Sequence, residues 1–179
     1  MKKLEVISQI IKNNTIDQTL YDEYDVKRGL RNKDGSGVLA GLTQISSVIG
    51  ARSIDYQRLP VEGELAYRGY NLFDIAEMFK LKDKFVFEKV AYLLLVGEKA
   101  DKKNEEAFIE ALTEKRNIPD VILEHAIKGI PSKNIMNKLQ TAVSALYSQD
   151  EDADSLDPIE NFNKAINLTA KIPLIIAYS

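Results

Sequence analysis

The sequence predicts a mainly α-helical fold that carries a small antiparallel β ribbon near residues 37–70. Three observations lead to this prediction. After residue 71 the apolar residues recur with the period of a helix, whereas residues 37–70 are rich in glycine and β-branched residues. The apolar fraction of 45% and the charged fraction of 28% are typical of globular proteins. A chain of 179 residues is long enough for one ordinary domain.

The composition excludes several classes of function. The chain has no cysteine, so disulfides, thiolate metal sites and a cysteine nucleophile are excluded, and a reducing, cytoplasmic location is expected. The net charge of −3 gives no reason to expect nucleic acid as a partner. No apolar run approaches the ~20 residues that a membrane-spanning helix needs. The N-terminal segment resembles neither a signal peptide nor a transit peptide.

The first part of the chain predicts one helix and then short strands. Leu4, Ile7, Ile10 and Ile11 lie on one face of a helix that ends near residues 13–14. Residues 22–34 are charged and irregular, and a turn follows at residues 33–37. Strands are then expected over residues 37–43, 44–50 and 64–67.

The rest of the chain predicts helices with recognisable ends. Asn71 is suited to cap the first of these helices, and Asp157 caps the last, where Pro158 follows. Pro173 is expected to kink or end that last helix. Residues 85–96 are apolar nearly all round, which favours deep burial, and Gly97 ends this helix. Further helices are expected at 105–115, between Pro119 and Gly129, and at 134–148, where Met136, Leu139, Val143 and Leu146 share one face.

Histidine occurs once, at position 125, beside Val121 and Ile122. A lone histidine could act as a general base, but the sequence pairs no carboxylate or hydroxyl with it. We therefore interpret His125 as a structural or surface residue.

Two other patterns match known ligand sites only in part. The spacing G-x-G-x-x-x-G at residues 35–41 is neither a dinucleotide fingerprint nor a P-loop. The acidic run 150–154 places carboxylates as a calcium loop does, but Ser155 and Asn161 stand where glycine and glutamate are required. We interpret the glycines as turn residues and the acidic run as a solvated linker. No metal site is predicted.

Arg28 and Arg68 are the most interesting polar residues, because each stands next to a glycine at the edge of a predicted element. Such a guanidinium can bind a phosphate or a carboxylate, or it can fix a turn by donating to backbone carbonyls. The structural role is favoured at Arg68, and both roles stay open at Arg28.

Taken in order along the chain, several segments resemble the N-terminal part of a citrate synthase. They are KRGLR at 27–31, GVLAGLTQIS at 37–46, GELAYRGYNLFDIA at 63–76, FEKVAYLLLVGE at 87–98, LQTAVSAL at 139–146 and AKIP at 170–173. The resemblance covers the chain after residue 24. The segment Ala51–Glu62 is longer than the turn of many members, and Asn134 stands where many have a histidine.

The resemblance implies that residues 1–179 form the first part of the large helical domain of an acyltransferase. Such enzymes condense acetyl-CoA with oxaloacetate to citrate and CoA, at the entrance of the tricarboxylic acid cycle. They are dimers in which the helix matching residues 134–148 lies at the two-fold interface. No permanently bound cofactor is expected, since acetyl-CoA is a substrate.

The resemblance also bears on the site residues. In the family a catalytic carboxylate and two catalytic histidines follow the AKIP segment, so no catalytic residue maps onto this chain. The chain alone is therefore predicted to be inactive. Arg28 matches an arginine near the CoA phosphates, supplied across the dimer, and it is the one predicted cofactor-binding residue.

Three interpretations stay open at this point. The chain is a fragment of a citrate synthase, a fragment of a 2-methylcitrate synthase that uses propionyl-CoA, or a non-enzymatic dimerisation or regulatory module. The sequence stops inside the apolar run 175–179, which favours a truncated product. Self-association as a homodimer or a larger assembly is expected, because a partial fold exposes apolar faces.

Overall fold

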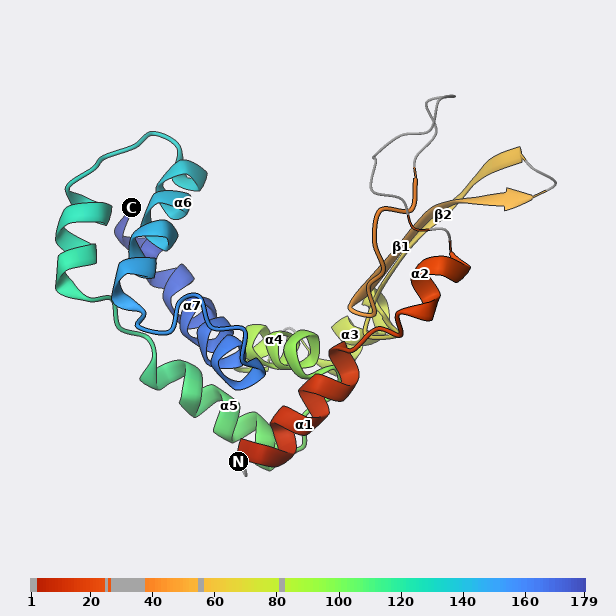
Figure 1. Ribbon diagram of the computed structural model, residues 1–179, viewed down its shortest axis with the longest axis horizontal. Coiled ribbons are helices and arrows are strands. Elements are labelled where there is room, and N and C mark those ends of the chain that lie inside the picture. Colours follow the sequence, from red (N-terminus) through yellow and green to blue (C-terminus); the bar gives the residue numbers. More distant parts are fainter. Residues whose placement is uncertain (1–2, 25, 27–37, 55–56, 81–82) are drawn as a thin grey trace. The chain divides into compact units, whose positions relative to one another are not determined.

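The computed structural model describes residues 3–24, 26, 38–54, 57–80 and 83–179 (Figure 1). The chain divides into two compact units, Met1–Asp101 and Lys102–Ser179. The first unit contains α1 (Lys3–Asn14), α2 (Thr19–Glu23), β1 (Ser46–Ile54), β2 (Gln57–Tyr67), β3 (Tyr70–Asn71), α3 (Leu72–Met78) and α4 (Val86–Val96). The second contains α5 (Lys102–Glu114), the π-helix η1 (Ile122–Lys128), α6 (Ile135–Leu146), the 3-10 turn η2 (Tyr147–Gln149) and α7 (Pro158–Tyr178).

The strands form an antiparallel sheet of order β1-β2-β3, which confirms the predicted ribbon. β1 and β2 pair from Ser46 opposite Tyr67 to Ile54 opposite Gln57, and the register shifts between Ile49 and Ala51. β3 is short and pairs with the last residues of β2. The ribbon therefore consists mainly of one long hairpin (Figure 1).

The predicted strand boundaries were partly wrong. Residues 38–43 form no strand, and β1 begins only at Ser46. Within the segment Ala51–Glu62, interpreted from the sequence as a longer turn, residues 51–54 belong to β1 and residues 57–62 to β2. Composition indicates strand propensity, but a strand also needs a partner, and β2 is already paired with β1 and β3.

Local signals place α3 and α4 as the sequence predicts. The Asn71 side chain accepts a hydrogen bond from the Phe73 N–H at 2.9 Å and caps α3. Gly97 ends α4 with a left-handed φ of 91°. Ile75, Phe79 and Leu93 form a small core between α3 and α4. α4 is not buried all round, since Phe87 on its other side is 57% exposed.

The short helix α2 was not predicted. The Asp17 carboxylate accepts from both the backbone N–H and the hydroxyl of Thr19, at 2.9 and 2.8 Å, just where α2 begins. These bonds lower the pKa of Asp17. A five-residue helix is too short for apolar periodicity to show in the sequence.

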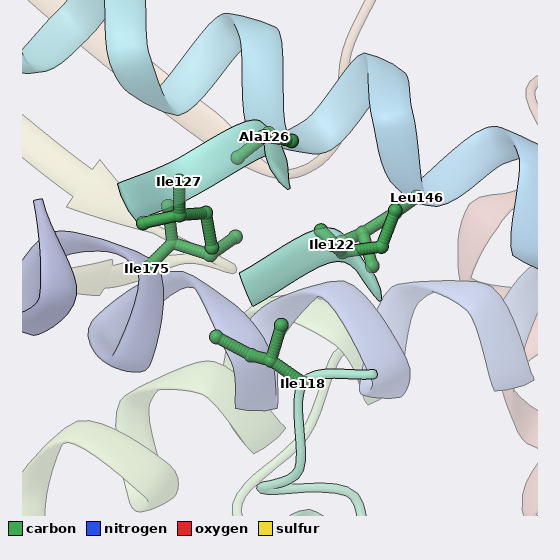
Figure 2. Packing of buried hydrophobic residues seen from close by; sticks show 7 residues of the cluster. Ile118, Ile122, Ala126, Ile127, Leu146 and Ile175 are labelled. Atoms are coloured by element: carbon green, nitrogen blue, oxygen red, sulfur yellow. The ribbon is translucent and has the colours of Figure 1, made fainter. Parts of the chain in front are cut away.

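The core of the second unit lies among η1, α6 and α7 (Figure 2). Its buried residues are Ile118, Ile122, Ala126, Ile127, Ala142, Leu146 and Ile175. The helix predicted between Pro119 and Gly129 is present, but seven of its residues are π-helical, which periodicity does not foresee. Gly129 ends it where a Cβ would stand 2.8 Å from the Glu124 carbonyl oxygen.

α7 begins where the sequence predicts, but it continues beyond Pro173, which was expected to kink or end it. The Asp157 carboxylate accepts from the backbone N–H groups of Ile159 and Glu160 at 2.9 and 3.1 Å. Pro173 does not end the helix, which continues to Tyr178. Ile175 is 1% exposed in the core, so packing of the last turn offsets the hydrogen bond that the proline removes.

The helices of the described residues do not combine the length and the apolar character that a bilayer crossing requires.

Candidate functional site

Arg28, the predicted cofactor-binding residue, lies outside the described residues, as do Gly35 and Gly37. Gly41 is described, and a Cβ there would meet nothing within 4 Å. No close contact within the described structure therefore requires a glycine at position 41. The role of Arg28 stays a prediction.

Arg68 stands in a strained turn. It forms, with Gly69, the two-residue loop that joins the paired residues Tyr67 and Tyr70. The two loop residues have φ values of 50° and 84°, as in the tight turns that favour asparagine and glycine. A left-handed backbone costs a residue such as arginine roughly 1–2 kcal/mol. Side-chain contacts must offset this cost.

The Arg68 guanidinium supplies those contacts by joining three segments of the first unit. Its Nε and Nη2 groups donate to the carbonyl oxygen of Leu94 in α4, at 3.1 and 2.7 Å. Its Nη1 donates to the carbonyl oxygen of Asn13 in α1 at 3.1 Å. Its Nη2 also donates to the Asn14 side-chain oxygen at 2.7 Å. We call this arrangement the Arg68 junction.

Reciprocal contacts close the Arg68 junction. The Asn13 side-chain amide donates to the Val96 carbonyl oxygen at 2.9 Å, and the Asn14 amide donates to Leu95 at 3.4 Å. A Cβ on Gly97 would lie 2.8 Å from the Cβ of Asn13, so this approach requires glycine. The ends of α1 and α4 therefore meet directly.

Four hydrogen bonds occupy most of the five donors of Arg68, and all its acceptors are uncharged oxygens. Burial lowers the pKa of this guanidinium from its usual value. A guanidinium held in this way cannot bind a carboxylate or phosphate through two parallel hydrogen bonds. The structure thus supports the structural role that the sequence favoured.

The His125 side chain is exposed on η1, where its neighbours Glu124 and Lys128 form an ion pair at 2.7 Å. Among the described residues no group of three or more acidic or histidine side chains could hold a metal ion.

The acidic run folds back on itself. The Tyr147 hydroxyl donates to Asp154 at 2.7 Å, and this carboxylate raises the pKa of the phenol. The Lys164 ammonium donates to the carbonyl oxygens of Ala153 and Ser155, each at 2.9 Å. These bonds fix the connection between η2 and α7.

Two buried lysines were missed by sequence reasoning. Lys138 is 2% exposed, and its ammonium donates to the carbonyl oxygens of Ile127 and Ile130 at the end of η1. It lies on the buried face of α6 with Ala142 and Leu146. The i, i+4, i+8 spacing of these three residues could have indicated that face.

Met136, which the helical spacing places on one face with Leu139, Val143 and Leu146, is 71% exposed. Leu139 and Val143, by contrast, pack against the core of the second unit.

Lys171, from the AKIP segment, is 8% exposed and donates to the side-chain oxygen of Asn167 one turn earlier in α7. Burial lowers the pKa of its ammonium, and the positive charge of Lys115 lowers it further. A buried cation beside a second cation costs stability.

Comparison with known proteins identifies the family. The family model described as "Citrate synthase, C-terminal domain" matches residues 30–179. The chain belongs to the citrate synthase family. It is 32% identical over 143 residues to citrate synthase 2 of Bacillus subtilis, which covers 79% of this chain and 33% of the relative. It is 31% identical over 157 residues to citrate synthase of Haloferax volcanii, covering 86% and 36%.

A 2-methylcitrate synthase is a relative of comparable similarity. The protein from Mycobacterium tuberculosis is 30% identical over 159 residues, covering 89% of this chain and 35% of the relative. The crystal structure of citrate synthase from Pyrobaculum aerophilum matches with a TM-score of 0.61 and 26% identity, covering 83% of this chain and 37% of that one. The chain thus spans about a third of the length of these citrate synthase family relatives.

The buried charge of Lys171 predicts an unusual stabilising substitution in this family member. Below the lowered pKa, Lys171 is charged in both the folded and the unfolded states, and the cost of burial is fully present. As the pH rises through that pKa toward 10.5, the folded state loses its proton first, so stability rises. Lys171→Met should raise the free energy of unfolding at pH 7 by on the order of 1 kcal/mol and remove the alkaline rise.

Urea denaturation between pH 7 and pH 10 measures both effects. The exposed Lys103 on α5 provides the matched control, and Lys103→Met should change neither the stability at pH 7 nor its pH dependence. A Lys171→Met protein less stable than wild type at pH 7 would contradict the account of this buried charge.

Proposed function

We propose that residues 1–179 form the first part of the large helical domain of a citrate synthase-type acyltransferase. The whole enzyme would condense acetyl-CoA with oxaloacetate and release citrate and CoA. Membership of the family, shown by the match over residues 30–179, is the observation that carries this proposal. A location in the cytoplasm, expected from the cysteine-free composition, stays a prediction.

The reaction requires groups that the described residues do not bring together. A base must take a proton from the acetyl methyl group, and donors must stabilise the enol and polarise the ketone. The single histidine of the sequence is exposed on η1, and Arg68 is committed to carbonyl oxygens. The proposed contribution of this chain is therefore a scaffold and one arginine, Arg28, directed at the CoA phosphates.

The acyl donor has two candidates. Relatives named citrate synthase and 2-methylcitrate synthase match this chain at 32%, 31% and 30% identity, so similarity favours neither name. Acetyl-CoA is the proposed donor, and propionyl-CoA is the alternative that the same assay tests. A non-enzymatic module is the third possibility, and restored turnover in the experiment below would exclude it.

We expect no CoA release when this chain alone is mixed with acetyl-CoA and oxaloacetate. Proton transfer and charge stabilisation act as a unit, so surface binding of the thioester cannot replace the missing groups. Adding a polypeptide that carries the remaining part of the fold should restore turnover. Arg28→Ala should then raise the apparent KM for acetyl-CoA by about tenfold, or about 1.4 kcal/mol.

A thiol-release assay measures each case, with propionyl-CoA as the second donor. Arg31→Ala, in the same KRGLR segment, is the matched control and should leave KM unchanged. Turnover by the chain alone that exceeds a protein-free blank and survives His125→Ala would disprove the proposed division of labour. If the KM for acetyl-CoA were unchanged in Arg28→Ala, the proposed contact between Arg28 and CoA would be wrong. The proposed division of labour would still stand.

We also propose that the chain self-associates through α6. The resemblance places the matching helix at the two-fold interface of family dimers. Both ends of this region expose apolar side chains, since Ile135 is 43%, Met136 71% and Tyr147 58% exposed. A partner that covers α6 and the adjoining η2 would remove these side chains from water.

Sedimentation should show a dimer or a larger species at concentrations of about tens of micromolar. Met136→Lys should weaken association by about tenfold or more, because it places a charge on the face that would be desolvated. Leu156→Lys is the matched control, since Leu156 is 89% exposed but lies in the connection before α7. A wild-type monomer, or equal effects of both substitutions, would count against association through α6.

A further inference from the structure

The position of Arg68 combines a disfavoured backbone with an unusually complete set of contacts. Asparagine or glycine would suit its φ of 50° better, and arginine brings no advantage to the turn itself. The advantage lies in what the guanidinium reaches, namely the last turn of α4 at Leu94 and the last turn of α1 at Asn13.

Both acceptors belong to helix C-termini. The last carbonyls of a helix have no partner within the helix, and the helix dipole gives this end a partial negative charge. In the Arg68 junction two such ends converge on one cation. The planar fork of arginine can serve both at once, whereas lysine presents a single charged nitrogen.

Among the described residues of α1, two pairs stand out. Near its beginning, Val6 and Ile7 are buried, at 8% and 7% exposure. At its end, Asn13 and Asn14 take part in the Arg68 junction. α1 contacts α4, and it is not part of the sheet.

We propose that α1 is a detachable strap and that Arg68 is its latch. When the junction breaks, α1 leaves α4 as a unit, while the sheet, α3 and α4 keep their own core of Ile75, Phe79 and Leu93. Opening uncovers the side of α4 that α1 contacts. This device depends only on the first unit and is independent of the proposed enzymatic function.

Hydrogen exchange of α1 amides tests the latch in variants of the full chain. Arg68→Asn keeps a residue that tolerates the turn but removes the guanidinium, and Arg68→Lys keeps a positive charge but removes the fork. In both variants the α1 amides should exchange at least about tenfold faster, while the amides of α3 and α4 change less than about twofold.

Arg52→Asn is the matched control, because Arg52 bonds only to the exposed Glu64 of the ribbon at 3.2 Å among the contacts described, and α1 should be unaffected. In Arg68→Gly, millimolar guanidinium should restore α1 protection, and an equal concentration of sodium chloride should not. Unchanged α1 exchange in Arg68→Asn would overturn the latch. Equal losses of amide protection in α1, α3 and α4 would show that α1 does not open separately, and would overturn the proposal of a strap.

The wild-type chain provides a further test that needs no variant. If α1 opens as a strap, the free energy of its opening is lower than that of the larger unfolding needed to expose α4. The α1 amides should therefore exchange at least about tenfold faster than the slowest amides of α4. Equal protection of the two helices in the wild type would overturn the proposal even if an Arg68 variant failed to fold.

Discussion

The first unit depends on a meeting of two helix ends around one cation. The final turns of α1 and α4 each leave carbonyl oxygens without partners, and the Arg68 guanidinium donates to both at 2.7–3.1 Å. Because Arg68 sits in the turn between β2 and β3, the same side chain also fixes the sheet relative to these helices. The left-handed backbone is tolerated because four hydrogen bonds stabilise it.

The same use of charge recurs in the second unit, and it bears on function. Lys138 and Lys164 each donate to backbone carbonyls of another segment and so hold two segments together. A citrate synthase must instead aim charged groups at two anionic substrates. This contrast supports the proposed role of the described residues as a scaffold.

Local signals allowed much of the helical architecture to be predicted. Asn71, Asp157 and Gly97 act through atoms a few residues away, so the sequence alone reveals them. The strand predicted over residues 37–43 is absent from the described residues 38–43, because strand pairing depends on distant parts of the chain. The acceptors of Arg68 lie 26 and 55 residues away, so its contacts could not be predicted from sequence.

The central claim is that Arg68 serves the structure of the first unit and does not bind a ligand. Nitrogen-15 NMR of arginine side chains tests this claim most directly, because the Arg68 Nε–H donates to the partly buried carbonyl oxygen of Leu94 at 3.1 Å. We expect one slowly exchanging Nε–H signal that is absent in Arg68→Lys and does not shift when acetyl-CoA and oxaloacetate are added. Fast exchange of this signal, or a shift that saturates with either substrate, would contradict the account.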